Sequence, residues 1–217
     1  IEFTVEGGRP DTLDAEKLRT IAAHGADRMS INPQTMEDHV LKACGRPHKA
    51  EDVLRAYQEA VDAGFTAINM DLIAGLPQDS FEGFCRSLDA VAALNPANIT
   101  VHTLALKRAA ALYQQRPDLP SGEEVAQMLD ETEQALRNAG YEPYYMYRQK
   151  HMLGNLENIG YAKEGYECIY NMQIMEEKQS NYALGAGSIT KFVYPDEDRI
   201  ERVENVKNVE QYIKMSK

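Results

Sequence analysis

Cysteine is scarce in this sequence, and the spacing of the few cysteines is informative. The three cysteines, Cys44, Cys85 and Cys168, lie far apart along the chain. They do not form a short cluster-binding motif, and three isolated cysteines do not form a disulfide framework. We interpret each of them as a small buried hydrophobic residue or an inert thiol.

Long apolar runs and an excess of basic residues are also missing. No apolar run approaches the roughly 20 residues needed to cross a bilayer, and no signal-peptide pattern opens the sequence. Acidic residues outnumber basic ones by 34 to 23, which gives a net charge of −11. This balance argues against broad binding to the phosphate backbone of nucleic acid and leaves room only for a local basic pocket. We therefore expect a cytoplasmic protein with no nucleic-acid or membrane partner.

The composition that remains is typical of a globular protein. The chain has 217 residues, of which 43% are hydrophobic and 26% are charged, enough to bury a sizeable core. No methionine opens the sequence, and its alternation of strands and helices is already under way at the first residues. We expect that the chain is part of a larger enzyme whose earlier units are missing here.

Strand-like and helix-like runs alternate through the first half. The expected strands are residues 1–5, Arg28–Asn32, Phe65–Ile73 and Ile99–Leu104, and the expected helices are Leu13–His24, Met36–Ala43, Ala50–Ala63 and Ser80–Leu94. The helices are recognised by apolar residues at helical spacing and by glycines after their last turns. A strand–helix–strand order at this spacing requires crossover connections, and these predict an α/β fold with a parallel sheet, open or closed into a barrel.

The regular alternation of strand-like and helix-like runs ends after Leu106. The run Arg116–Pro120 predicts a turn or linker, and Ser121–Ala139 predicts a strong helix that opens with a capping-box-like Ser121-Gly-Glu-Glu124. The remainder is rich in tyrosine and asparagine, and the run from Glu201 to Lys217 predicts a charged surface helix or tail. We expect one domain over residues 1–115 and a helical and α+β region over residues 116–217.

Polar residues follow or interrupt successive predicted strands. Glu6 follows Phe-Thr-Val, Gln34 follows Met-Ser-Ile-Asn, Asp71 follows Ile-Asn-Met, and the fourth strand runs toward Ala105. Loops at the carboxyl ends of parallel strands bind ligands because the strands hold them rigidly. Each polar residue also has a structural interpretation, as a helix cap, a surface group or a buried group satisfied by backbone amides. Asp71 is the sharpest candidate, because a carboxylate within an apolar run needs partners or a purpose.

Other polar and glycine positions carry weaker signals. Arg46 lies in the turn Cys44-Gly45-Arg46-Pro47-His48, where its guanidinium suits a ligand carboxylate, although a surface arginine is the simpler interpretation. His102, within a predicted strand, is interpreted as a satisfied core histidine. The pair Gly185 and Gly187 forms a Gly-x-Gly pattern that by itself indicates only a turn.

Several spaced motifs together resemble a known family. These are the runs VEGGRPDTLDAEKLRTIAAHGADRMSINPQ, GRPH, INMDLIAGLPQDS and ALNPANITVHTLAL, which occur in this order within a similarity that covers nearly the whole chain. They resemble radical S-adenosylmethionine enzymes of the oxygen-independent coproporphyrinogen III oxidase type, in the coproporphyrinogen dehydrogenase branch. The resemblance implies the later half of a partial (β/α) barrel with a small carboxyl-terminal α+β appendage.

The resemblance also implies cofactors and a reaction. In that family, thiolates of a CxxxCxxC motif hold a [4Fe–4S] cluster, and S-adenosylmethionine yields a 5′-deoxyadenosyl radical. That radical leads to decarboxylation of propionate groups of coproporphyrinogen III to the vinyl groups of protoporphyrinogen IX. The implied partners are a tetrapyrrole substrate and an electron donor. The implied S-adenosylmethionine contacts are Glu6, Gln34, Arg46, Asp71 and Ala105.

The sequence departs from the family pattern in one respect that limits its function. It contains neither the cluster motif nor the first two barrel strands, so we expect the isolated polypeptide to bind no cluster by the family's mode and to be inactive. No protein metal ligand and no catalytic residue is assigned within it. Three alternatives stay open: a haem chaperone on the same scaffold, a radical SAM enzyme with another substrate, and a different α/β enzyme that uses its carboxylates for acid–base chemistry.

Overall fold

The computed structural model describes residues 1–105, 118–148 and 152–215. The chain forms two compact units, Ile1–Glu167 and Cys168–Lys217. The boundary predicted between residues 115 and 116 lies outside the described residues and stays a prediction. The predicted turn at Arg116–Pro120 begins in the same undescribed segment.

A single sheet organises the first unit. Its strands are β1 (Thr4–Gly8), β2 (Arg28–Ile31), β3 (Ala67–Ala74), β4 (Asn98–Thr103), β5 (Glu142–Tyr147) and β6 (Asn158–Ala162), in the spatial order β1-β2-β3-β4-β6-β5. Strands β1 to β4 pair in parallel, as the alternation of strands and helices predicted. Strands β6 and β5 continue the sheet in antiparallel pairing beyond β4, so segments from the second half of the sequence complete the sheet of the first.

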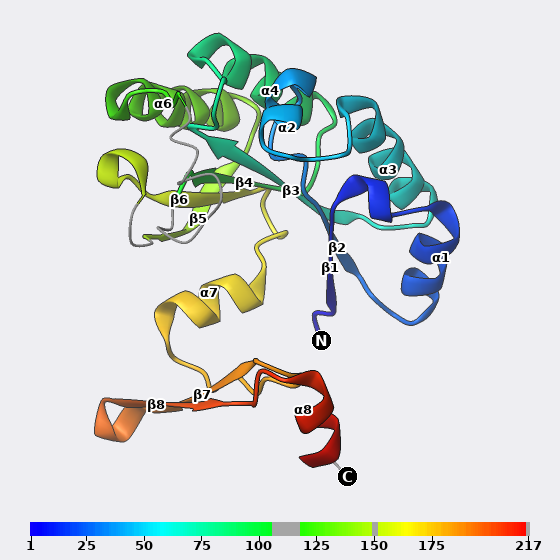
Figure 1. Ribbon diagram of the computed structural model, residues 1–217, viewed down its shortest axis with the longest axis vertical. Coiled ribbons are helices and arrows are strands. Elements are labelled where there is room, and N and C mark those ends of the chain that lie inside the picture. Colours follow the sequence, from blue (N-terminus) through cyan, green and yellow to red (C-terminus); the bar gives the residue numbers. More distant parts are fainter. Residues whose placement is uncertain (106–117, 149–151, 216–217) are drawn as a thin grey trace. The chain divides into compact units, whose positions relative to one another are not determined.

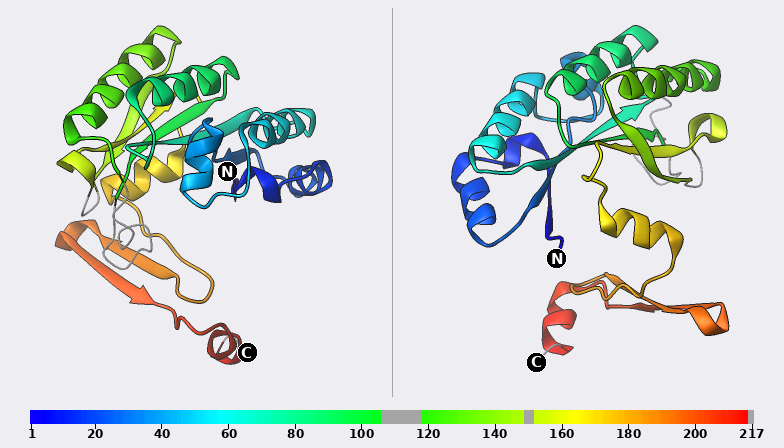
Figure 2. Two further views of the ribbon diagram at one scale, coloured as in Figure 1. Left: turned by 45° about the horizontal axis from the view of Figure 1, so that its top comes forward. Right: turned by 180° about the vertical axis from the view of Figure 1, so that it is seen from behind.

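Helices cover one face of this sheet. They are α1 (Ala15–Ala23), α2 (Asp38–Ala43), α3 (Ala50–Asp62), α4 (Phe81–Ala93) and α6 (Gly122–Asn138), together with the short 3-10 turns η1 (Pro10–Thr12) and η2 (Leu153–Asn155). Figure 1 shows α1, α3, α4 and α6 in an arc along the same face. The two further views in Figure 2 show the same arrangement, which is that of a partial (β/α) barrel with its helices outside.

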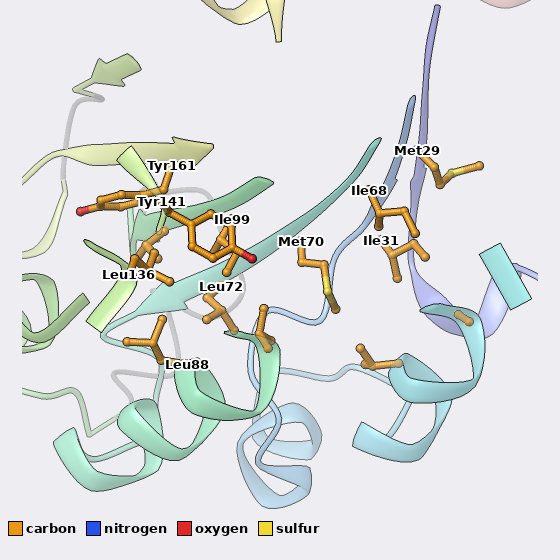
Figure 3. Packing of buried hydrophobic residues seen from close by; sticks show 14 of the residues in the cluster. Met29, Ile31, Ile68, Met70, Leu72, Leu88, Ile99, Leu136, Tyr141 and Tyr161 are labelled. Carbon is orange, nitrogen blue, oxygen red and sulfur yellow. The ribbon is translucent and has the colours of Figure 1, made fainter. Parts of the chain in front are cut away.

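The hydrophobic core lies between these helices and the sheet. Successive side chains of β3 alternate in burial, because side chains of a strand point to opposite faces. Ile68, Met70 and Leu72 are almost completely buried, whereas Asn69 and Asp71 between them are only partly buried. Figure 3 shows the buried side chains on the helix-covered face, where Leu88 of α4 meets them. The opposite face of the sheet is therefore free to carry polar groups.

Local signals fix the helix ends. Ser80 and Ser121 cap α4 and α6 by accepting the backbone N–H of Gly83 and Glu124. The predicted capping box at Ser121 forms only in part, because the Glu124 carboxylate accepts the N–H of Phe81 at the start of α4. Gly25, Gly64 and Gly140 follow α1, α3 and α6 with φ of 87°, 97° and 83°, and this left-handed backbone ends a helix most easily at glycine.

Some predicted element bounds were wrong, and the positions of Glu6 and Asp71 within their strands bear on the site. Glu6 lies inside β1 rather than after it. Asp71 lies inside β3, within the predicted strand Phe65–Ile73 but not at its end, so strand alternation decides which face each side chain occupies. The short predicted helix over Met36–Ala43 begins only at Asp38.

The second unit consists of α7 (Ile169–Glu176), the antiparallel pair β7 (Ile189–Tyr194) and β8 (Arg199–Glu204), the turn η3 (Pro195–Glu197) and α8 (Val209–Met215). The charged surface helix or tail predicted from Glu201 starts later in the structure, because residues up to Glu204 pair with β7 and α8 begins at Val209. Gly185 and Gly187 lie in the turn before β7 with φ of 112° and 74°. The model contains no helix long and apolar enough to span a membrane among its described residues.

Candidate functional site

The face of the sheet opposite the helices carries a row of polar side chains. Strand register places Glu6 beside Ser30, Ser30 beside Asn69, and Asp71 beside Thr100. Residues paired in register, and residues two apart on one strand, share a face. Glu6 and Asp71 therefore lie on the same polar face, although 65 positions of sequence separate them.

Asp71 is held in a network that extends across three strands. Asn69 Nδ2 donates to Asp71 Oδ1 at 2.7 Å, and Thr100 Oγ1 donates to Asn69 Oδ1 at 3.1 Å. His102 Nε2 lies 3.5 Å from Asp71 Oδ2, and its Nδ1 lies 3.2 Å from the Tyr147 hydroxyl. These contacts fix the position of the carboxylate and give each of its oxygens a polar neighbour, which a partly buried carboxylate requires.

His102 differs from its interpretation as a core histidine. It is partly exposed on the polar face and has contacts at both ring nitrogens. The polar residues Asn98, Thr100 and His102 recur at every second position of β4, and this period-two pattern could have indicated a polar face. The contribution of Tyr147 could not be read from local pattern, because β5 reaches β4 only through β6.

The charge of Asp71 affects the pKa of Glu6. The pKa of Glu6 is raised above its ordinary value, first because surrounding groups remove part of its hydration and second because of the negative charge of Asp71. A hydrogen bond from Ser30 and the His102 ring act in the opposite direction. A positively charged ligand on this face would relieve the repulsion between Glu6 and Asp71.

Gln34 connects this face to the carboxyl edge of the sheet. Its N–H donates to the Asp71 carbonyl at 2.9 Å, and its carbonyl accepts the N–H of Ile73 at 2.9 Å. Gln34 lies three residues after the end of β2 and forms an isolated parallel bridge with Leu72 of β3. Its φ of 69° is unusual for a residue other than glycine, and such a conformation persists only where surrounding contacts hold it.

A cavity of about 170 Å³ lies at this edge. It is lined by Gln34, Thr35, Leu41, Cys44, Arg46, Ile73, Leu76 and Leu104. Arg46 reaches it from the turn after α2, where Gly45 adopts a φ of 68° and the Arg46 N–H donates to the Leu41 carbonyl at 2.9 Å. Within the described part of the chain the Arg46 guanidinium has no hydrogen bond or ion pair, so its charge is available to an anionic group.

Ala105 follows β4 at the same edge. It forms an isolated bridge with Met152, and the neighbouring Leu104 lines the cavity. The five residues selected from the sequence thus fall into two adjoining sets. Glu6 and Asp71 lie on the polar face, Gln34 and Arg46 line the cavity, and Ala105 lies next to a residue that does. The backbone bond between Gln34 and Asp71 joins the two sets.

Comparison with known proteins gives the class of this architecture. Residues 1–91 match the family described as the Radical SAM superfamily. A solved structure titled as coproporphyrinogen III oxidase (HemN) from Escherichia coli, a radical SAM enzyme, superposes with a TM-score of 0.74 at 22% identity over 99% of this chain and 49% of that one. The fold is thus the partial barrel of radical SAM proteins.

Particular relatives are similar in sequence. The oxygen-independent coproporphyrinogen-III oxidase-like protein HemZ of Bacillus subtilis is 43% identical over 97% of this chain and 42% of its own length. The heme chaperone HemW of the same species is 30% identical over 86% of this chain and 47% of its own length. The chain is thus similar to HemZ-type radical SAM proteins, and it spans less than half the length of these two relatives.

Proposed function

We propose that this chain forms the S-adenosylmethionine-binding part of a radical SAM oxidoreductase. The observation that carries the proposal is that two sets of groups adjoin, the Glu6 and Asp71 carboxylates on the polar face of the sheet and the cavity at its carboxyl edge lined by Gln34 and Arg46. These groups suit S-adenosylmethionine, which carries a positive sulfonium, ribose hydroxyls, an amino-acid carboxylate and an adenine ring.

Each residue has a role that its chemistry supports. The Glu6 and Asp71 carboxylates accept hydrogen bonds from ribose hydroxyls and offset the sulfonium charge. The Arg46 guanidinium pairs with the methionine carboxylate, and the Gln34 side-chain amide supplies a further donor and acceptor. The backbone at Ala105 faces adenine.

The second cofactor of the proposed enzyme is a [4Fe–4S] cluster. The part of the chain that the structure describes has no group of three or more His, Cys, Asp or Glu side chains placed to hold a metal ion. We therefore assign the cluster ligands to the full-length protein outside this sequence. When bound, the reduced cluster and S-adenosylmethionine would together supply a 5′-deoxyadenosyl radical able to abstract a hydrogen atom from the substrate.

The proposed substrate is a tetrapyrrole, coproporphyrinogen III. Each propionate that becomes a vinyl group would lose one hydrogen atom to the 5′-deoxyadenosyl radical, carbon dioxide, and one electron to an electron acceptor. A separate external electron donor would reduce the cluster. The similarity to HemZ supports this substrate. The residues of this chain would bind and orient the cofactor beside the polar face. We also propose a cytoplasmic location for the enzyme.

The test is anaerobic reconstitution of the full-length protein. We expect reductant-dependent formation of 5′-deoxyadenosine from S-adenosylmethionine, and release of carbon dioxide when coproporphyrinogen III is added. The variant Arg46→Ala should weaken S-adenosylmethionine binding, measured by calorimetry, whereas Arg19→Ala on α1, outside the cavity, should leave it unchanged. A well-formed cluster with no cleavage of S-adenosylmethionine would contradict the proposal.

A haem chaperone is the second candidate, because the chain is also 30% identical to HemW. A chaperone would retain haem, whereas an oxidase would decarboxylate coproporphyrinogen III. Titration with haem and assay of decarboxylation on the same preparation separate them. Tight haem retention without decarboxylation would favour the chaperone, and decarboxylation with weak haem binding would favour the oxidase.

A further inference from the structure

His48 occupies the point where three segments of the proposed cofactor site meet. It is 2% exposed, and it ends the turn that presents Arg46. Its Nε2 lies 3.2 Å from the carbonyl of Pro33, the residue before Gln34. Its Nδ1 lies 3.9 Å from Oδ1 of Asp11, in the η1 turn that follows β1 and Glu6.

The contacts of the ring determine what it can do. A carbonyl oxygen only accepts hydrogen bonds, so Nε2 must carry a hydrogen and donate to Pro33. Nδ1 is buried and has no hydrogen-bond partner among the described residues. Its nearest charged group is Asp11, whose pKa is lowered first by the hydrogen bond from Arg9 and in smaller part by His48. The ring is thus attached to Pro33 by a hydrogen bond, and its Nδ1 lies close to the Asp11 carboxylate.

This arrangement explains how Gln34 is held. The left-handed backbone of Gln34 is fixed on one side by its two bonds to β3. On the other side, His48 fixes the carbonyl of Pro33, which belongs to the peptide group that enters Gln34. The same side chain ties this peptide to the Arg46 turn, so the two polar residues of the cavity share one buried support.

We propose that His48 is a positioning residue that aligns Gln34 and Arg46, and through Asp11 the loop after Glu6, for binding S-adenosylmethionine. His48 touches no ligand in this role. The inference rests on the proposed function for its ligand, but the mechanical link between the three segments can be measured without any ligand.

Hydrogen exchange in the full-length protein, read at single amides by mass spectrometry, measures the link. The informative amides are those of Leu13, Gln34 and Arg46, which donate to Pro10, Asp71 and Leu41. The reference amide is that of Tyr141, which donates to Leu136 at the distant end of α6. In His48→Phe we expect exchange to rise at Leu13, Gln34 and Arg46, by about tenfold at Gln34 and Arg46 since one hydrogen bond is lost, with Tyr141 unchanged.

A conservative variant separates positioning from simple filling of space. His48→Gln restores a donor for the Pro33 carbonyl, and we expect it to recover most of the protection at Gln34 but not at Leu13. The affinity for S-adenosylmethionine, measured by calorimetry, should fall about tenfold in His48→Phe and less in His48→Gln. His24→Phe is the matched control, because His24 is exposed and contacts only the Thr20 carbonyl of its own helix.

The outcomes are distinct. Wild-type exchange at Gln34 and Arg46 in His48→Phe would overturn the proposal. So would equal behaviour of the Phe and Gln variants, or a uniform rise that includes Tyr141, because these indicate loss of packing alone. If the wild-type protein binds no S-adenosylmethionine while the exchange pattern is as expected, the proposed function fails and the link between the three segments stands.

Discussion

At the scale of single residues, Asp71 shows how a charged group is kept on a sheet that is otherwise built from apolar side chains. Its neighbours Met70 and Leu72 are buried against the helices, whereas Asp71 faces the other way toward Asn69 and His102. Strand β3 therefore presents apolar side chains to the helix-covered face of the sheet and polar side chains to the opposite face. Asn69 and His102 hold the carboxylate in place without a ligand, as the proposed role of Asp71 in binding S-adenosylmethionine requires.

Replacement of Asp71 should reveal this role. In Asp71→Asn we expect S-adenosylmethionine to bind about 10- to 100-fold more weakly, because hydrogen bonds to a charged group contribute about 1.5 to 3 kcal/mol. Calorimetric titration of the full-length protein measures the change. Asp62→Asn, on the exposed end of α3, is the control and should bind as the wild type does. Unchanged affinity in Asp71→Asn would remove Asp71 from the site.

At the scale of elements, the amino-terminal end of α4 carries an unusual carboxyl group. Asp79 is 9% exposed, its Oδ1 accepts the N–H of Ser80, and its Oδ2 is buried without a hydrogen bond in the described structure. Burial is the main cause that raises the pKa of Asp79 to about 6, against the lowering effect of the Ser80 N–H. The folded chain therefore keeps this carboxyl group neutral up to a higher pH than the unfolded chain does.

This preference predicts how stability changes with pH. A raised pKa means that the favourable contribution of neutral Asp79 is complete below its ordinary pKa of 3.8 and is lost as pH rises through about 6. Asp79→Asn stays neutral, so it should be more stable than the wild type by about 1 to 3 kcal/mol at pH 7.5 and similar at pH 4. Urea denaturation at both pH values measures this. Asp130→Asn, on an exposed position of α6, should show no such difference.

The junction of β5 and β6 depends on one glycine. A Cβ on Gly160 would lie 1.8 Å from Cε1 of Tyr145. The Tyr145 ring lies over Gly160, its register partner, and stacks on Tyr147 at a centroid distance of 6.2 Å. Gly160 thus leaves the space that lets the aromatic side chains of β5 lie against the sheet.

Gly160→Ala should separate these strands. We expect a loss of about 3 kcal/mol or more in the free energy of unfolding, because the rigid ring must move and take β5 with it. Chemical denaturation measures the loss. The double variant Gly160→Ala with Tyr145→Ser should recover a large part of it, since the clash is absent. A double variant no more stable than Gly160→Ala would show that the ring is not the cause.

At the scale of the whole molecule, cluster binding requires more than this sequence supplies. Cys44 and Cys85 lie in the first unit and Cys168 in the second, and no cluster of metal-binding side chains occurs within the described residues. We expect a polypeptide of this sequence to take up no [4Fe–4S] cluster, and the full-length protein to take up one. Iron analysis and the visible absorption near 410 nm compare the two. Stoichiometric iron in the short polypeptide would contradict the assignment of cluster ligands.

Much of the fold could be predicted because its signals are local. Apolar spacing gave the helices, serine caps and glycines gave many of their ends, and the order of strands and helices gave the parallel sheet of β1 to β4. The faces of Glu6 and Asp71 were less certain, because an error of one residue in a strand boundary moves a side chain to the other face.

The sequence by itself determined the alternation of strands and helices and placed polar residues near successive strand ends, because periodicity and capping act over a few neighbouring residues. Only the tertiary structure decided that β6 pairs with β4, that Tyr147 reaches His102, that Glu124 caps α4, and that His48 joins Asp11 to Pro33. These contacts join residues that are distant in sequence, and their partners are chosen by packing and pairing of whole elements, which no local pattern records.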